Sequence, residues 1–352
     1  MKSHFFKKIT SDEIGNLLGL NHLEIVAREY ILKNSDAKVI EKIMWRSNTE
    51  SNIKELFIKY GTTPSFLKEI LFYDALAQPV RDQIPKLISY QINPERYIMI
   101  FEWIEGDNPN FTNGNIVRSV FHNLGIFAAS FEQPIISYQH GEVHGLIKGK
   151  SQYGQNNTDE TIRSLFEKKR IHEILLELCE LVRLKEDLVK AIGGEKLLLN
   201  VGKMENGFIE QMIDSIYQLP LTVHPGDVSK FNILIRQSNN KPVFLDFENM
   251  KIGPMCLLVE YIGEKDIHVP PKQFSKLALQ SYLDGWNSKS KNIVEWNKFH
   301  FSYICTRIIY KCYLLGWWLK NEGRNTGREW VLPHVSDLSF LFDIVETKRL
   351  RS

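Results

Sequence analysis

Cysteine is scarce in this chain of 352 residues, and the few cysteines do not pair by spacing. Cys179, Cys256, Cys305 and Cys312 form no C-x-x-C pair and match neither a zinc knuckle nor a disulfide framework. We therefore expect buried free thiols, as in a reducing compartment.

Long apolar runs and a charge excess are also missing. The opening segment MKSHFFKKIT is basic but lacks the apolar run of a secretory signal, and no window of about 20 apolar residues suggests a membrane span. The 44 Lys and Arg nearly balance 42 Asp and Glu, which gives a formal charge of +2 and no global field for nucleic acid. These absences predict a cytoplasmic protein that binds neither membranes nor nucleic acids.

The composition that remains is that of a globular protein, with 43% hydrophobic and 24% charged residues. β-branched and apolar residues in EIVAREYILKN and AKVIEKIMW, separated by Asn34-Ser35-Asp36, predict an antiparallel hairpin. A helical pattern opens at Thr63-Pro64-Ser65, and the runs PKLISYQI and RYIMIFEWI predict a second pair of strands. The first hundred residues thus predict a small sheet with one helix.

The pattern changes near Gly106, where Asn, Pro and Gly residues accumulate. Beyond this point helical patterns dominate, beginning with IVRSVFHNLGIFAASF and continuing in an amphipathic run from Thr161 to Lys190. Residues 147–160, which have few large apolar side chains, predict an exposed loop. We expect an α+β protein with an N-terminal lobe of residues 1–106 and a mainly helical lobe of residues 107–352.

Two polar clusters between apolar strand-like runs carry the chemistry. LTVHPGDVSKFNILI contains Asp227 and Asn232, and PVFLDFENMKIGP contains Asp246. A hairpin-like framework would present these three side chains together. Phosphoryl transfer needs a carboxylate beside the attacking hydroxyl and hard oxygen ligands that hold magnesium against a triphosphate.

The order and spacing of these motifs resemble the aminoglycoside phosphotransferase and choline kinase superfamily, which shares its two-lobed plan with protein kinases. The resemblance extends over roughly residues 23 to 262 and is most specific in the two motifs. It implies that Asp227 is the catalytic base, and that Asn232 and Asp246 bind magnesium. Gly226 before the base, Gly253-Pro254 and Leu124-Gly125 also match recurring family features.

The sequence departs from the family pattern at two places. The histidine usually found two residues before the catalytic Asp is replaced by Pro225, and His224 stands one position further away. A structural contact to the backbone is the better interpretation of His224. The first hairpin also lacks a glycine triplet, so backbone N–H groups or the Ser35 hydroxyl would contact the phosphates. Glu248 could touch a second metal ion or cap a turn.

The family resemblance also implies a lysine for the α- and β-phosphates and an acid that holds it. Lys42, on the second strand, and Glu69, in the first helix, are the candidates. Lys38 competes with Lys42, because both lie on one face of the same strand. The hinge that would bind the adenine edge is assigned to Phe101, Glu102, Trp103 and Ile104.

The sequence therefore predicts a kinase that transfers phosphate from ATP or GTP, with Mg²⁺, to the hydroxyl of a small molecule. Antibiotic resistance and metabolite phosphorylation both fit, and the protein could be a monomer or a homodimer. One alternative is a catalytically silent relative that only binds a ligand. Another is a Ser/Thr protein kinase, against which the missing Ala-Pro-Glu segment argues.

Overall fold

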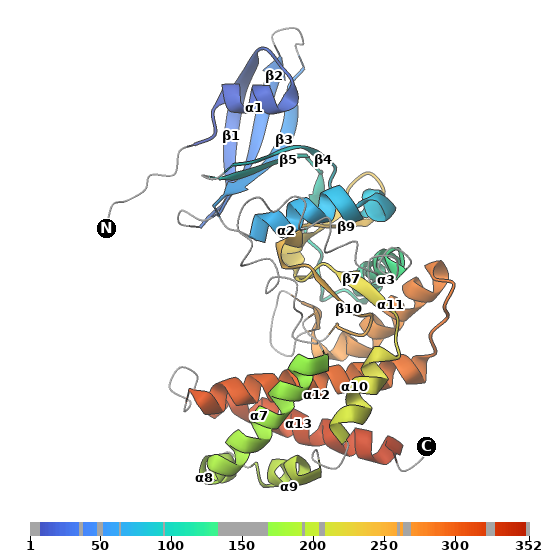
Figure 1. Cartoon of the computed structure of the whole chain (residues 1–352). Helices are drawn as coiled ribbons and strands as arrows, with labels where there is room; N and C mark the ends of the chain where they lie inside the picture. Colours follow the sequence, from blue (N-terminus) through green and yellow to red (C-terminus); the bar gives the residue numbers. More distant parts are fainter. Residues whose placement is uncertain are drawn as a thin grey trace.

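A computed structural model gives the arrangement of the chain (Figure 1). It describes the following residues: 8–34, 38–47, 52–62, 65–93, 96–132, 168–191, 194–203, 208–258, 261–262, 269–321 and 328–349. The exposed loop expected at residues 147–160 and the hairpin residue Ser35 lie outside these ranges.

The N-terminal part is an antiparallel sheet of five strands in the order β1-β2-β3-β5-β4. The strands are β1 (Leu23–Asn34), β2 (Lys38–Ser47), β3 (Lys54–Gly61), β4 (Leu87–Ile92) and β5 (Tyr97–Glu102). Both expected strand pairs, β1 with β2 and β4 with β5, are confirmed as antiparallel. The central strand β3, which pairs with β2 and β5, was not expected from the sequence.

Strict alternation in β2 explains how one face of this sheet is buried. Val39, Ile43 and Trp45 point to one side and are buried together with residues of β3 and β5. Helix α1 (Ser11–Leu18) covers this side, and its first turn is closed by a capping box between Thr10 and Glu13. The opposite side of β2 carries every second residue, among them Lys38, which contacts Asp246 of the second lobe.

The connection between β3 and β4 is helical, and the type of helix changes along its length. It comprises α2 (Ser65–Leu71), the π-helix η2 (Phe72–Leu76) and the 3-10 helix η3 (Gln78–Gln83). In Figure 1 this segment lies between the small sheet and the rest of the molecule. Phe66 and Ile70 of α2 are buried against Met99 and Phe101 of β5, which fixes the helix to the sheet.

The second part of the chain is mainly helical, with two short sheets near the first lobe. Its helices are α3 (Gly114–Ala129), α7 (Lys168–Leu184), α8 (Glu186–Ala191), α9 (Glu195–Lys203), α10 (Ile209–Tyr217), α11 (Ser275–Lys289), α12 (Trp296–Lys320) and α13 (Arg328–Arg349). Its strands are β6 (Gly106–Asp107), β7 (Leu221–His224), β8 (Ile233–Arg236), β9 (Pro242–Phe244) and β10 (Lys251–Pro254), with 3-10 turns η6 (Lys230–Asn232), η7 (Phe247–Asn249) and η9 (Lys272–Phe274).

Two glycines allow α3 and α11 to touch through their backbones. A Cβ on Gly125 would lie 2.0 Å from the Tyr282 carbonyl oxygen, and one on Gly285 would lie 1.9 Å from the His122 carbonyl oxygen. Larger side chains at either position would separate the helices. Gly125, noted in the sequence beside Leu124, is therefore explained by packing.

The short strands assemble the polar segments in the middle of the molecule (Figure 1). β8 and β9 form the expected hairpin, β6 adds to the other edge of β8, and β10 pairs with β7. An α+β architecture with a small antiparallel sheet and a larger helical lobe is thus confirmed. β6 begins at Gly106 and pairs with β8 of the second lobe, which supports a division near residue 106. The division itself stays a proposal.

The cysteine prediction is also confirmed, because all four thiols are free and buried. Among the residues that the structure describes, none of the helices combines the length and the apolarity that a bilayer crossing requires.

Candidate active site

Asp246 lies at a sharp turn two residues after the end of β9. Its backbone has φ of 61°, in the left-handed region that few residues other than glycine adopt. Such a conformation is maintained only when the surroundings hold it, and it often marks a functional position. Phe247, the next residue, is held in place by two features: its side chain is fully buried, and its N–H donates to Glu69 Oε1 at 3.3 Å.

The loop that carries Asp227 crosses this turn in close contact. Gly226 has φ of 94°, and a Cβ there would lie 1.9 Å from the Asn249 carbonyl oxygen. Only glycine permits both features. Gly226 therefore brings the Asp227 loop against the 3-10 turn that follows Asp246.

Asp227 itself is exposed, and the Ser229 N–H donates to its Oδ1 at 2.9 Å. This local bond orients the carboxylate while the other oxygen can accept a proton. His224 is buried, and its Nε2 lies 3.0 Å from the Pro254 carbonyl oxygen of β10. The backbone contact expected for His224 is confirmed. It ties β10 to the end of β7, from which the Asp227 loop begins.

Asn232 precedes β8 and contacts the residue before Asp246 in the β8–β9 hairpin. The Leu245 N–H donates to the Asn232 carbonyl oxygen at 2.8 Å, one residue before Asp246. The hairpin-like framework expected from the sequence therefore exists and brings Asp227, Asn232 and Asp246 into one region.

A buried lysine of the small lobe reaches this region. Lys59 of β3 is 2% exposed, forms an ion pair with Glu69 of α2, and lies 2.6 Å from Asp246 Oδ1. One ammonium thus joins the sheet, the helix and the second lobe. Glu248 Oε2 lies further away, at 3.6 Å.

The electrostatics of this cluster follow from burial and charge together. Burial alone would lower the pKa of Lys59, but the carboxylates of Glu69, Asp246 and Glu248 outweigh it and raise that pKa above its ordinary range. Burial would raise the pKa of Asp246, but Lys59 and Lys38 lower it below the ordinary 3.8. Burial raises the pKa of Glu69, against the opposing effect of Lys59. Lys59 and Asp246 are therefore both charged at neutral pH.

Aromatic stacking holds the Asp246 turn against the first lobe. The ring of Phe247 stacks on Phe72 of η2, with 4.0 Å between centroids and 15° between planes. Phe127 of α3 lies 5.9 Å away on a nearly parallel plane. Movement of the α2–η2 segment would therefore be transmitted to the residue after Asp246.

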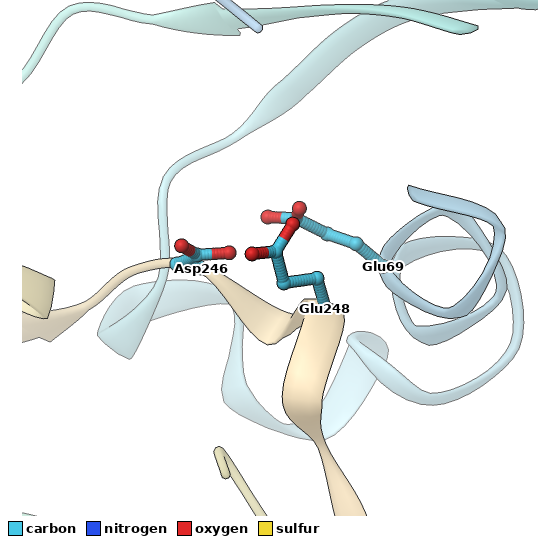
Figure 2. A group of neighbouring side chains, drawn as sticks. All are labelled: Glu69, Asp246 and Glu248. Atoms are coloured by element: carbon cyan, nitrogen blue, oxygen red, sulfur yellow. The ribbon is translucent and has the colours of Figure 1, made fainter. Parts of the chain in front are cut away.

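Three carboxylates converge at the centre of the cluster, as Figure 2 shows. Glu69 approaches from α2, while Asp246 and Glu248 come from the turn after β9, and their nearest oxygens lie within 4.8 Å of one another. Carboxylate oxygens are hard ligands of the kind that magnesium prefers. The partly exposed donor set at Asp246 and Glu248 fits a divalent cation, whereas the Glu69 side chain is buried against Lys59.

The expected pairing of Lys42 with Glu69 is wrong. Lys42 lies 2.6 Å from Glu55 Oε1, and its ammonium is 4.3 Å from the centre of the Trp103 ring. Lys42 thus lies on the same face of β2 as Lys38 but close to Trp103. It does not reach Glu69, because β3 lies between β2 and β5 and carries Lys59 to Glu69. Its competitor Lys38 does reach the site, with Nζ 2.8 Å from Asp246 Oδ2 and 2.8 Å from Glu248 Oε1.

The structure of the sheet removes Phe101 from the residues assigned to the adenine-binding hinge. Phe101 is 2% exposed and lies within the sheet, opposite Phe57 of β3 and Leu87 of β4, so it belongs to the core. The Glu102 N–H donates to the Lys86 carbonyl oxygen at 3.0 Å. Glu102, Trp103 and Ile104 then connect the lobes, and adenine binding there stays a proposal.

Sequence reasoning missed Lys59, although a signal was present. The run ELFIKYG contains one lysine among apolar and aromatic residues, ten positions before Glu69. A lone lysine in a run that is otherwise suited to a buried strand is a candidate for a buried ion pair, because lysine is rarely buried without a partner.

Comparisons with known proteins address the fold. No protein-family model matches the sequence, and no curated protein matches it. An aminoglycoside phosphotransferase from Alicyclobacillus acidocaldarius is similar in structure, with a TM-score of 0.51 and 11% identity over 99% of this chain and 97% of that one. A choline kinase from Cryptosporidium parvum matches with a TM-score of 0.46 and 13% identity, over 94% and 90% of the two chains.

A fructosamine-3-kinase homologue of Haemophilus somnus matches with a TM-score of 0.45 and 11% identity, over 95% of this chain and 96% of that one. At such identities only the fold is comparable, and the first of these structures covers nearly the entire chain. Together with the two-lobed arrangement, the likeness to the aminoglycoside phosphotransferase structure confirms the expected fold: the chain has a protein-kinase-like, two-lobed α+β fold.

Proposed function

We propose that this protein is a small-molecule kinase, which transfers the terminal phosphate of ATP or GTP to a hydroxyl group. The observation that carries the proposal is Lys59, buried between Glu69 and Asp246. Its ammonium contacts acids of both lobes and lies beside the turn that carries Asp246 and Glu248. This arrangement is suited to holding a triphosphate in place.

Each residue near the cleft has a distinct task in this proposal. Lys59, oriented by Glu69, contacts the α- and β-phosphates. Glu102, Trp103 and Ile104 bind the adenine edge. The Ser35 hydroxyl stays a candidate phosphate contact, outside the residues that the structure describes.

Asn232 and Asp246 would hold magnesium, with Glu248 as a further carboxylate ligand. When bound there, magnesium supplies positive charge to the phosphate oxygens. Asp227 accepts the proton of the attacking hydroxyl and aligns it with the terminal phosphate, so catalysis consists of positioning and charge neutralisation. The exposure of Asp227 supports this role, because an acceptor can reach its carboxylate from solvent.

The acceptor is a small hydroxyl compound, either a metabolite or an antibiotic. The deciding experiment is a screen of hydroxyl-bearing metabolites and aminoglycoside antibiotics for nucleotide consumption by purified protein, with ATP and GTP run side by side. Acceptor-dependent consumption that disappears in Asp227→Asn supports the proposal. Magnesium-dependent nucleotide binding without transfer to any acceptor favours a silent relative, and transfer only to protein substrates favours a protein kinase.

A further inference from the structure

Lys38 has no assigned role so far, although it contacts the centre of the cluster. It is the first residue of β2, at the end of the β1–β2 hairpin, where it pairs in register with Asn34 and with Gly61. Its Nζ lies 2.8 Å from Asp246 Oδ2 and 2.8 Å from Glu248 Oε1, and its side chain is 14% exposed. A single ammonium therefore bridges both carboxylates that fit a divalent cation.

The two lysines divide the carboxylate oxygens between them. Lys59 contacts Asp246 Oδ1, whereas Lys38 contacts Oδ2 of the same side chain and Oε1 of Glu248. A divalent cation bound between Asp246 and Glu248 would need the lone pairs that Lys38 now occupies. An ammonium and a metal ion at contact distance would also repel each other strongly in this partly desolvated region.

Of the two lysines, Lys38 is the one whose ammonium can move away from the carboxylates. Lys59 is enclosed by the sheet and α2, with 2% of its side chain exposed, and Glu69 holds it from the other side. Lys38 lies at the end of a strand, partly exposed, on a flexible four-carbon stem. Rotation of this stem can move the ammonium away from the carboxylates without any displacement of the sheet.

We propose that Lys38 is an exchangeable cation of the active site. In the nucleotide-free protein it bridges Asp246 and Glu248, and on binding of a metal–nucleotide complex it transfers to the outer phosphates of the triphosphate. This deepens the proposed function and rests on it. The exchange makes metal binding depend on nucleotide, because the triphosphate provides the new anionic partner that lets Lys38 release the carboxylates.

The first measurement uses metal alone. Mn²⁺ is titrated into the nucleotide-free protein of residues 1–352, and the free ion is followed by electron paramagnetic resonance. Lys38→Met removes the charge and keeps the length of the side chain, so it should bind Mn²⁺ about tenfold more tightly than the parent. Lys38→Arg, which keeps the charge, and Lys42→Met, four residues along the same face and paired with Glu55, should both stay close to the parent.

The second measurement uses a non-hydrolysable ATP analogue with Mg²⁺ in calorimetry. The expected change in affinity is now opposite to that for Mn²⁺ alone. Lys38→Met loses a phosphate contact and should therefore bind the complex about tenfold more weakly. Far-UV circular dichroism and the urea midpoint verify that each variant is folded, and Lys38→Arg provides the charge-preserving comparison.

The outcomes separate this inference from the proposed function. Unchanged or weaker Mn²⁺ binding by Lys38→Met overturns the competition between lysine and metal. Tighter Mn²⁺ binding with unchanged analogue binding overturns the transfer to phosphate. If the parent does not bind the analogue with Mg²⁺, the proposed function fails and the transfer step fails with it, while the Mn²⁺ comparison still decides whether Lys38 competes with metal.

Discussion

Replacement of Lys59 by Met tests the core of the site, because it removes the buried charge while almost preserving the volume. The Lys59 side chain is 2% exposed and that of Glu69 is 3% exposed. Without Lys59, the Glu69 carboxylate keeps the Phe247 N–H as a neutral donor but loses its counter-ion. Breaking a buried pair from one side costs about 3–5 kcal/mol, and we expect the free energy of unfolding to fall by that amount.

The double variant shows whether the two residues act as one unit. Glu69→Gln removes the carboxylate charge and retains an oxygen that can accept from Phe247. When Lys59→Met and Glu69→Gln are combined, no uncompensated charge remains in the pair, so the combined loss should fall short of the sum by about 2–3 kcal/mol. Lys42→Met is the matched control, because Lys42 and Glu55 are 17% and 30% exposed and such a pair contributes about 0–1 kcal/mol.

Urea unfolding followed by far-UV circular dichroism measures these differences. A parallel titration with Mg²⁺ and a non-hydrolysable ATP analogue should show weaker binding for Lys59→Met than for Lys42→Met. The reasoning would be refuted by strict additivity of the two substitutions, or by a Lys59→Met protein within about 1 kcal/mol of the parent.

Four further outcomes are expected. Asp227→Asn should slow transfer by about 100-fold to 10,000-fold and leave analogue affinity nearly unchanged; comparable turnover in a single-turnover assay would remove Asp227 as the base. Asp246→Asn and Asn232→Ala should lose Mg²⁺-dependent thermal stabilisation by ATP, and stabilisation equal to the parent's would contradict their role as metal ligands. The pKa of Asp246 is lowered in the folded state, so its contribution to stability is complete above the ordinary pKa of 3.8 and is lost as the pH falls through the folded value. The difference in urea stability between the parent and Asp246→Asn should therefore hold from about pH 8 to about pH 5 and shrink in stronger acid, and a difference already shrinking near neutral pH would show that the pKa is not lowered. Gly226→Ala should reduce both urea stability and transfer, because its φ of 94° and the 1.9 Å approach to the Asn249 carbonyl oxygen exclude a Cβ; a fully active, equally stable variant would contradict this packing.

The sequence alone determined the parts of this protein that depend on local patterns. Runs of apolar and β-branched residues separated by turn residues predicted the β1–β2 and β4–β5 hairpins, since such residues favour strands and turn residues mark where one strand ends and the next begins. Asp227, Asn232 and Asp246 are candidate site residues because their spacing within short strand-flanked segments resembles a known catalytic pattern, and their roles stay a proposal. The buried thiols followed from the absence of any pairing pattern.

Only the tertiary structure decided which cations meet these acids. Lys42 and Lys59 both lie on strands of the same sheet, and the strand order places β3 next to β5 and against α2. Glu69 therefore meets Lys59, ten residues away in sequence, and not Lys42. Local pattern could not distinguish them, because the sequence of β2 does not reveal that another strand separates it from the hinge strand.

The contact of Lys38 with Asp246 joins residues that are 208 positions apart. Neither segment carries a local signal for the other, because the contact arises from the packing of one lobe on the other. The pKa of Asp246, the raised pKa of Lys59 and the position of the exchangeable cation all depend on this packing. Charges at such separation meet only when burial brings their strands together, and burial is a property of the whole fold.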